Sequence, residues 1–137
     1  MGTGSLSLNK METNKLQDKI KKFNADREWG KTWEIKDLML NMNEEIGEMW
    51  HVIKWINEDK QKEMIEKSNK EVGNFIGDMS YLLFKIAFIC NIDLERETLK
   101  VLEEYEKRMP IDKIKQFKHG NVKAGGYDKK NGSCNTG

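Results

Sequence analysis

The sequence predicts an all-α protein, a helix bundle formed by a single domain, and three observations support this fold class. The chain has one proline in 137 residues, so few positions force a turn. Lys, Glu, Met, Leu and Ile are abundant, which favours long helices over a strand-rich domain. Through residues 35–56, apolar side chains recur at spacings of three and four, the period of a helix with one buried face. A second core is not expected, because each half of so short a chain would bury too little apolar surface.

The first half of the chain predicts two helices after a short leader. Residues 1–12 are small and polar and lack the basic and apolar regions of a signal peptide, so we expect a leader that is disordered or foreign to the natural chain. The first helix is expected over Thr13–Ala25, with Thr13 as its N-cap. The second is expected over Ile35–Asn57. Its buried stripe comprises Ile35, Leu38, Met42, Ile46, Met49, Ile53 and Ile56.

The second half predicts two more helices and a tail. The charged segment Lys60–Lys70 is expected to be helical in part, and Glu71–Cys90 to form a third main helix. The end of that helix is apolar on nearly every side, which is typical of a bundle centre or a subunit interface. A fourth helix should follow Asp93 as N-cap and end before Pro110. The domain is therefore expected over residues 13–110, followed by a basic, Gly-rich, mobile tail over residues 111–137.

Charge, hydropathy and cysteine content argue against several classes of protein. The chain has 24 Lys and Arg against 23 Asp and Glu, so we expect no general binding to a nucleic acid polymer. The longest apolar run, Tyr81–Cys90, is shorter than the roughly 20 residues of a membrane span, so no membrane partner is expected. Two cysteines form neither a disulfide framework nor a zinc site. The expected compartment is the cytoplasm.

An acidic pair on the second helix is the first candidate site. Glu45 lies seven residues after Leu38 and four before Met49, so it shares the inward face of the helix. A buried carboxylate without a partner is costly, and it usually has a cation beside it or a raised pKa. Glu48 follows one turn later, and both carboxylates suit a hard cation such as Mg²⁺, with Mn²⁺ as an alternative. Glu44 either supplies a third oxygen or faces solvent.

The third main helix offers an opposing wall. Glu71, Asn74 and Asp78 fall at i, i+3 and i+7 on one face. Glu71 and Asp78 lie about 10 Å apart along the axis, too far to share one ion directly unless two ions bind or the helix bends. Asp78 is the stronger ligand candidate because it immediately precedes the apolar segment. The alternative is that in a chain with 23 acids such pairs arise by chance and form surface contacts with Lys.

Tryptophans near the acidic pair suggest a place for a nucleobase. Trp55 lies seven residues after Glu48, on the same line of the expected helix. Its ring could stack on a base whose phosphates are held by the ion. Trp29 and Trp33 precede this helix and could close the pocket from the other side. Packing in the core is the alternative role for these rings.

In this order, these residues resemble the all-α nucleoside triphosphate pyrophosphatases of the MazG-like superfamily, most closely the dCTP pyrophosphatase branch. The similar stretch runs from Phe23 to Pro110, about two thirds of the chain. The matching residues are Phe23 with Arg27-Glu28-Trp29, Glu45-Ile-Gly-Glu48 with Trp55, Asp78 before an apolar run, Cys90-Asn-Ile-Asp93-Leu94, and Lys107-Arg108-Met109-Pro110. The Lys54-Trp55 pair and the C-terminal Gly-Gly-Tyr-Asp-Lys-Lys also resemble the dimeric dUTPases of the same superfamily.

The resemblance implies a four-helix bundle, assembled as a homodimer or homotetramer, that binds Mg²⁺ on an ExxE and an ExxD motif. It implies cleavage of a nucleoside triphosphate to the monophosphate and pyrophosphate. Carried over by position, Glu45 and Glu48 match the first motif and Asp78 the last acid of the second, all three as metal ligands and catalytic residues. The base would lie between Trp29 and Trp55, and Tyr81 is also expected to contact the nucleotide.

The chain departs from the family in three places. Phe75 stands where the family carries Glu, so Asn74 or Glu71 would have to supply the missing ligand. Near the end of the fourth helix, Val101 and Tyr105 replace residues that face the phosphates. Phosphate contacts would then come from other basic residues, namely Lys100, Lys107, Arg108 or the tail. The third departure is Trp33, which stands where the family often has His.

These observations leave three functional hypotheses. The first is a Mg²⁺-dependent pyrophosphohydrolase that removes noncanonical or excess nucleotides. The second is a catalytically weakened relative that binds a nucleotide or a protein partner, suggested by Phe75, Val101 and Tyr105. The third is a helical oligomerisation module, which leaves the inward position of Glu45 unexplained.

Overall fold

The structure is a computed structural model that describes residues 12–29, 34–115, 127–128 and 133–134. The described chain is helical apart from one short pair of strands, so the predicted all-α class is confirmed. The chain divides into two units, residues 1–94 and residues 95–137, which are described separately. The boundary between them lies inside the range predicted as one domain.

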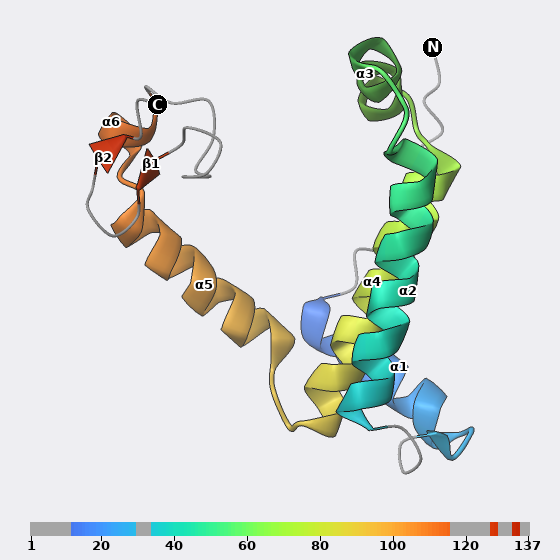
Figure 1. The fold of residues 1–137 in the computed structure, drawn as a ribbon. Coiled ribbons are helices and arrows are strands. Elements are labelled where there is room, and N and C mark those ends of the chain that lie inside the picture. The colour runs from blue at the N-terminus through green and yellow to red at the C-terminus, as the bar shows by residue number, and fades with distance from the viewer. Residues whose placement is uncertain (1–11, 30–33, 116–126, 129–132, 135–137) are drawn as a thin grey trace, which may run out of the picture. The chain divides into compact units, whose positions relative to one another are not determined.

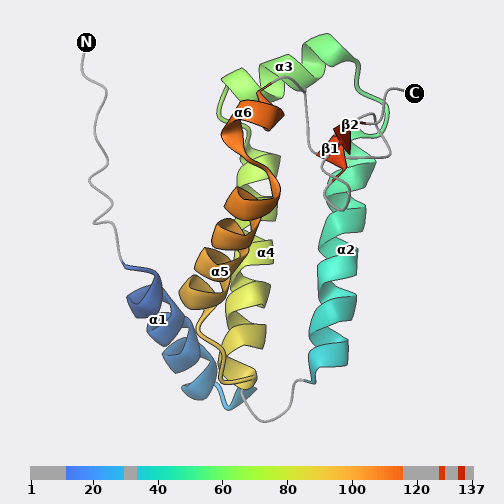
Figure 2. The same ribbon diagram turned by 90° about the vertical axis from the view of Figure 1, so that its left-hand side faces the viewer.

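The first unit contains α1 (Thr13–Ala25), α2 (Ile35–Ile53), α3 (Glu58–Glu66) and α4 (Lys70–Ile89). Helices α2 and α4 lie side by side and run in opposite directions, with α3 joining them at one end (Figure 1, Figure 2). Helix α1 packs against α4. The pair α2 and α4 therefore forms the framework on which the candidate site is built.

Helix α1 has the predicted bounds but not the predicted cap. Thr13 is its first helical residue, and Glu12 occupies the N-cap position without a side-chain hydrogen bond. The side chain of Gln17 instead ties the helix to the chain that follows α4. Its Nε2 donates to the Ile92 carbonyl oxygen at 2.9 Å, and its Oε1 accepts from the Leu94 N–H at 3.2 Å.

Helix α2 is four residues shorter than predicted. The Asp37 side chain accepts a hydrogen bond from the Glu34 N–H at 3.2 Å, which stabilises the start of the helix. The helix ends at Ile53. Asn57, expected as its last residue, is the N-cap of α3 and accepts from the Lys60 N–H at 2.9 Å. The apolar spacing continues to Ile56, but the capping chemistry of Asn57 begins a new helix.

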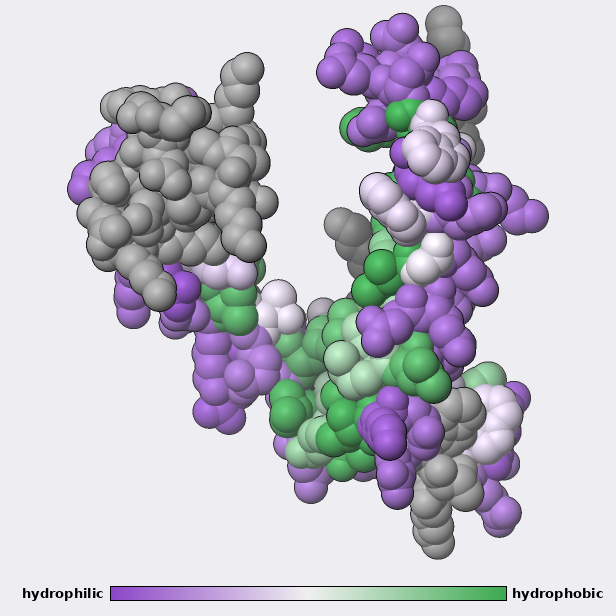
Figure 3. All heavy atoms as spheres, in the orientation of Figure 1, coloured by the Kyte–Doolittle hydropathy of each residue, from purple (hydrophilic) through white to green (hydrophobic). Residues whose placement is uncertain are grey.

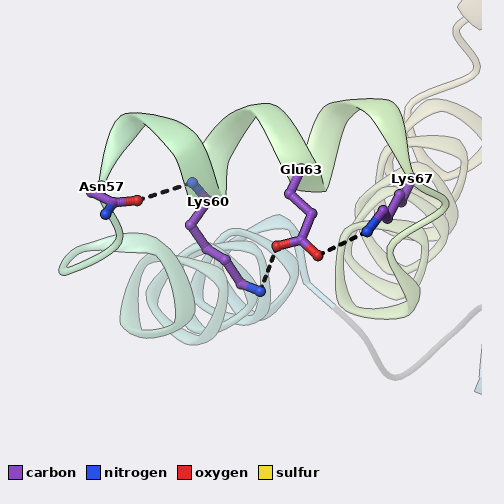
Figure 4. Close-up of polar contacts among 4 residues, drawn as sticks. All are labelled: Asn57, Lys60, Glu63 and Lys67. Atoms are coloured by element: carbon purple, nitrogen blue, oxygen red, sulfur yellow. Dashed lines mark hydrogen bonds and ion pairs between the residues drawn. The ribbon is translucent and has the colours of Figure 1, made fainter.

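Helix α3 is held by charged side chains along one side (Figure 4). Glu63 accepts from the Lys60 ammonium at 2.6 Å and from the Lys67 ammonium at 3.1 Å. These hydrogen bonds, first from Lys60 and then from Lys67, lower the pKa of Glu63. The segment predicted to be helical in part over Lys60–Lys70 therefore forms a helix over Glu58–Glu66.

Helix α4 lies one residue earlier than predicted and has caps at both ends. Asn69 accepts hydrogen bonds from the Glu71 N–H at 3.0 Å and the Val72 N–H at 3.1 Å. At the other end Asn91 has a positive φ of 57°, a conformation that Asn tolerates better than most residues. The Ile92 N–H then reaches back to the Ala87 carbonyl oxygen at 2.8 Å, which closes the helix.

Among the described residues, the apolar core is small. Its buried apolar side chains are Leu38, Leu82, Phe84 and Ala87. The stripe predicted to be buried on α2 is only partly so, because Ile35 and Ile46 are 47% and 48% exposed. Hydrophobic side chains gather at the surface over the part of the first unit where α4 ends (Figure 3). Helix periodicity correctly predicts the apolar face of α2 but overestimates how much of it is covered within one chain.

Helix α5 (Leu94–Arg108) starts directly after Asp93, as predicted. All of α5 but its first residue belongs to the second unit, which also contains α6 (Ile111–Ile114). Strands β1 (Tyr127–Asp128) and β2 (Ser133–Cys134) pair antiparallel. The range predicted as a tail thus contains a helical turn and a strand pair. Residues 1–11 of the leader and the other tail positions, 116–126, 129–132 and 135–137, lie outside the described residues.

By length and composition, α4 is apolar enough to cross a membrane. Its most apolar window has a mean hydropathy of 1.3, and 22% of that window is buried. The sequence prediction considered only the uninterrupted apolar run and so omitted the first half of the helix. A core helix of a water-soluble protein passes the same test, so one such helix is weak evidence for a membrane.

Candidate functional site

A hollow of about 220 Å³ lies between α2 and α4 and brings most of the predicted acids together. We call it the carboxylate hollow. Its lining residues are Glu45, Glu48, Met49, Val52, Glu71, Asn74, Phe75 and Asp78. Helix α2 places its four lining residues on one face, and α4 does the same, because spacings of three and four return to the same side of a helix. Five of the six predicted metal ligands thus line one hollow, namely Glu45, Glu48, Glu71, Asn74 and Asp78.

The carboxylate hollow carries a concentrated negative charge. Glu45 is the half-buried member, whereas Glu48 and Asp78 are exposed. Desolvation raises the pKa of Glu45 above its ordinary value of 4.5, and repulsion from Asp78, Glu48 and Glu44 raises it further. A positive ion in the hollow would relieve this repulsion, because it favours the charged form of every carboxylate around it.

The acids do not form a ready-made coordination sphere. Within the part of the chain that the structure describes, no group of three or more His, Cys, Asp or Glu residues is close enough to hold a metal ion. The carboxylates and the Asn74 amide nevertheless provide the oxygen donors that Mg²⁺ prefers, and Mg²⁺ commonly binds through one or two carboxylates while keeping several waters. The donor set therefore fits a hydrated Mg²⁺ better than a fully protein-bound metal.

The remaining predicted ligands lie at different positions around the hollow. Glu71 and Asn74 line it, as Asp78 does. Glu44 does not, although its charge contributes to the pKa of Glu45. It lines a separate shallow hollow with Gly47, Glu48 and His51. Phe75 lies in the wall of the carboxylate hollow, so an apolar ring occupies the position where the resembling family has an acid.

The raised pKa of Glu45 predicts how stability changes with pH. Below about pH 4 the carboxyl is protonated in both states and adds no penalty; as pH rises, the unfolded chain releases its proton first, so the folded state loses stability. In metal-free buffer, Glu45→Gln should therefore raise the melting temperature at pH 7, and the gain should disappear near pH 4. Thermal unfolding of both proteins across this range measures the effect. If the two melting temperatures differ by the same amount at every pH, the pKa of Glu45 is not raised in the folded protein.

The tryptophans predicted to hold a base do not meet in the structure. Trp29 packs beside Phe23, with ring centroids 6.0 Å apart, and lies above Lys85 of α4. Trp55 follows the end of α2, is 86% exposed and lies beside Lys54. Because α2 and α4 are antiparallel, these two rings lie toward opposite ends of the helix pair. Within one subunit, the structure therefore does not place the two rings on opposite sides of a single base, as the sequence predicted.

The other predicted contacts fall into three groups. Tyr81 lies one turn beyond Asp78 on α4, and its hydroxyl donates to the Asn24 Oδ1 at 3.1 Å. Trp33 lies outside the described residues. Lys100 and Arg108 belong to α5 in the second unit, where they pair with Glu97 at 2.8 Å and with Glu104.

Sequence reasoning missed the buried ammonium of Lys85. This side chain is 2% exposed, and burial lowers its pKa. The signal was present, because Lys85 is the one charged residue of the apolar run Tyr81–Cys90 and stands seven residues after Asp78.

No known protein family, curated protein or solved structure matches the chain.

Proposed function

We propose that the protein is a Mg²⁺-dependent nucleoside triphosphate pyrophosphohydrolase that acts in nucleotide-pool cleansing in the cytoplasm. The observation that carries the proposal is the carboxylate hollow, where Glu45 and Glu48 of α2 face Asp78 of α4. The order of the matching motifs and their resemblance to the MazG-like superfamily supply the reaction. The same resemblance supports a four-helix bundle assembled as a homodimer or homotetramer.

In this reaction, water attacks the α-phosphorus of the triphosphate and the bond to the β-phosphate oxygen breaks, releasing the monophosphate and pyrophosphate. Mg²⁺, or Mn²⁺ in its place, supplies the positive charge that offsets the phosphates. Glu45, Glu48 and Asp78 would hold the ion in part through its bound waters, with Asn74 and Glu71 as further oxygen donors. A carboxylate of the hollow accepts the proton of the attacking water, and both Glu45 and Glu48 are candidates for this role.

Exposed apolar residues on α2 support the oligomer. Ile35, Met39, Ile46 and Trp50 lie at helical spacing on one side of α2 and are each about half exposed. Contiguous apolar surface of this kind often marks an interface with another chain. A second copy would cover it without blocking the hollow, because the lining residues Glu45 and Glu48 lie on another side of the helix.

The second candidate function is a nucleotide- or protein-binding module without turnover, and Phe75 favours it. The ring removes one oxygen donor from the hollow, and fewer acidic ligands weaken the binding of a hard cation. Such a module would retain the helices and the nucleotide contacts but lack the charge needed to activate water.

A panel assay separates the two candidates. Purified protein incubated with Mg²⁺ and with canonical and modified triphosphates, dCTP and dUTP among them, should release pyrophosphate from at least one. Omission of the metal should abolish this release, because the phosphate charge is then not offset. If no nucleotide is cleaved but one of them raises the melting temperature, the binding module is the better account. If no nucleotide does either, both candidates are wrong.

A further inference from the structure

Lys85 occupies an unusual position for a charged side chain. It lies on α4 between the buried residues Phe84 and Ala87, and only 2% of it is exposed. Its Nζ lies 5.6 Å from the ring centroid of Trp29, within the range of a cation–π interaction. Burial lowers the pKa of Lys85, so the charge is held there at a cost. An unbranched side chain such as Met has a similar length but carries no charge.

The ring of Trp29 is supported on a second side by other aromatic residues. Phe23 meets Trp29 edge to face at 73°, and it meets Tyr81 in the same manner at 89° with centroids 6.2 Å apart. Tyr81 is in turn fixed by its hydrogen bond to the fully buried Asn24. Trp29 itself remains 42% exposed. The indole is therefore supported by Phe23 and Lys85 but still offers surface to a ligand.

This aromatic cluster lies in line with the carboxylate hollow. Asp78 and Lys85 are seven residues apart on α4, so they share one side of the helix and lie about 10 Å apart along its axis. The distance is comparable to that between the α-phosphate and the far edge of the base in an extended nucleotide. Phosphates held near Asp78 would place the base close to Trp29, whereas Trp55 lies toward the other end of the helix pair.

We propose that Lys85 is a positioning residue that orients the Trp29 ring as a stacking platform for the nucleobase. The inference rests on the proposed function, because it needs a nucleotide with its phosphates in the carboxylate hollow. The Lys85 ammonium attracts one π-face of the Trp29 indole. This contact holds the ring in one orientation before the base binds. Because the ring is already ordered, less conformational freedom is lost when the nucleotide binds.

The test compares Lys85→Met with Lys85→Arg in steady-state kinetics, using the triphosphate of the panel that wild type cleaves best. Lys85→Met should raise KM about fivefold with kcat nearly unchanged. Lys85→Arg keeps the cation and should restore most of the affinity. Lys70→Met, at the exposed start of α4, is the matched control and should leave KM unchanged.

A double-mutant cycle tests whether Lys85 changes KM through its contact with Trp29. Trp29→Ala alone should raise KM more than Lys85→Met does, and Lys85→Met added to Trp29→Ala should have no further effect. If the two substitutions raise KM additively, Lys85 does not act by positioning Trp29. The same conclusion follows if Trp29→Ala raises KM but Lys85→Met leaves it unchanged. If Lys85→Met does not fold, Lys85→Gln provides the uncharged variant. A wild type that neither cleaves nor binds dCTP or dUTP with Mg²⁺ overturns the proposed function itself, which is a distinguishable result.

Discussion

Asp78→Asn should reduce pyrophosphate release by about a thousandfold while leaving the helical structure intact. Asp78 and Glu71 are the two acids that α4 contributes to the carboxylate hollow. Of the carboxylates that repel Glu45, Asp78 repels it most strongly. The Asp78→Asn substitution replaces a charged carboxylate ligand of the metal with a neutral amide of nearly the same size. The folded state should not suffer, because Asp78 is exposed and its loss relieves repulsion. Turnover and far-ultraviolet circular dichroism measured on the same preparation check both statements.

A matched control separates the loss of this acid from a general change in charge. Glu66→Gln removes one negative charge from the exposed end of α3, away from the residues that line the hollow. It should retain turnover within about twofold, since a distant exposed charge is largely screened. If Asp78→Asn remains as active as Glu66→Gln, the acids of the hollow are not the catalytic centre.

The fold could be predicted where periodicity and local chemistry agree. The bounds of α1 and α4 agree with the sequence prediction to within one residue at each end, although the predicted N-cap of α1, Thr13, is its first helical residue. α2 was predicted too long, because Ile56 continued the apolar spacing past the true end at Ile53. The N-cap role of Asn57 depends on a new helix beginning there, and periodicity alone does not indicate that start.

The candidate site could be predicted in its acids but not in its aromatic contacts. Glu45, Glu48 and Asp78 lie on strongly periodic helices, so their faces follow directly from sequence spacing. Trp29 and Trp55 lie toward opposite ends of the helix pair, and spacing along the sequence does not show how far apart two such rings lie once the helices pack. The contact of Trp29 with Lys85 joins residues far apart in the sequence, and no local pattern predicts such a contact.

Leu38→Ala should strongly destabilise the first unit. Leu38 is 0% exposed and is the one fully covered apolar side chain that α2 contributes to the described core. Removing its three outer carbons leaves a cavity between helices, and such changes cost about 2 to 5 kcal/mol. Because the described core has so few buried apolar side chains, neighbouring residues have little scope to fill the space. Urea or thermal unfolding of wild type and variant measures the loss.

Leu40→Ala is the control, because it makes the same chemical change two residues away on the same helix. Leu40 is 59% exposed, so its truncation should cost less than about 0.5 kcal/mol. The difference between the variants isolates burial from helix propensity, since both replace Leu by Ala in the same α2 helix. Equal losses would show that Leu38 is not packed as the structure has it. A large loss for Leu40→Ala alone would mean that another chain covers that side of α2.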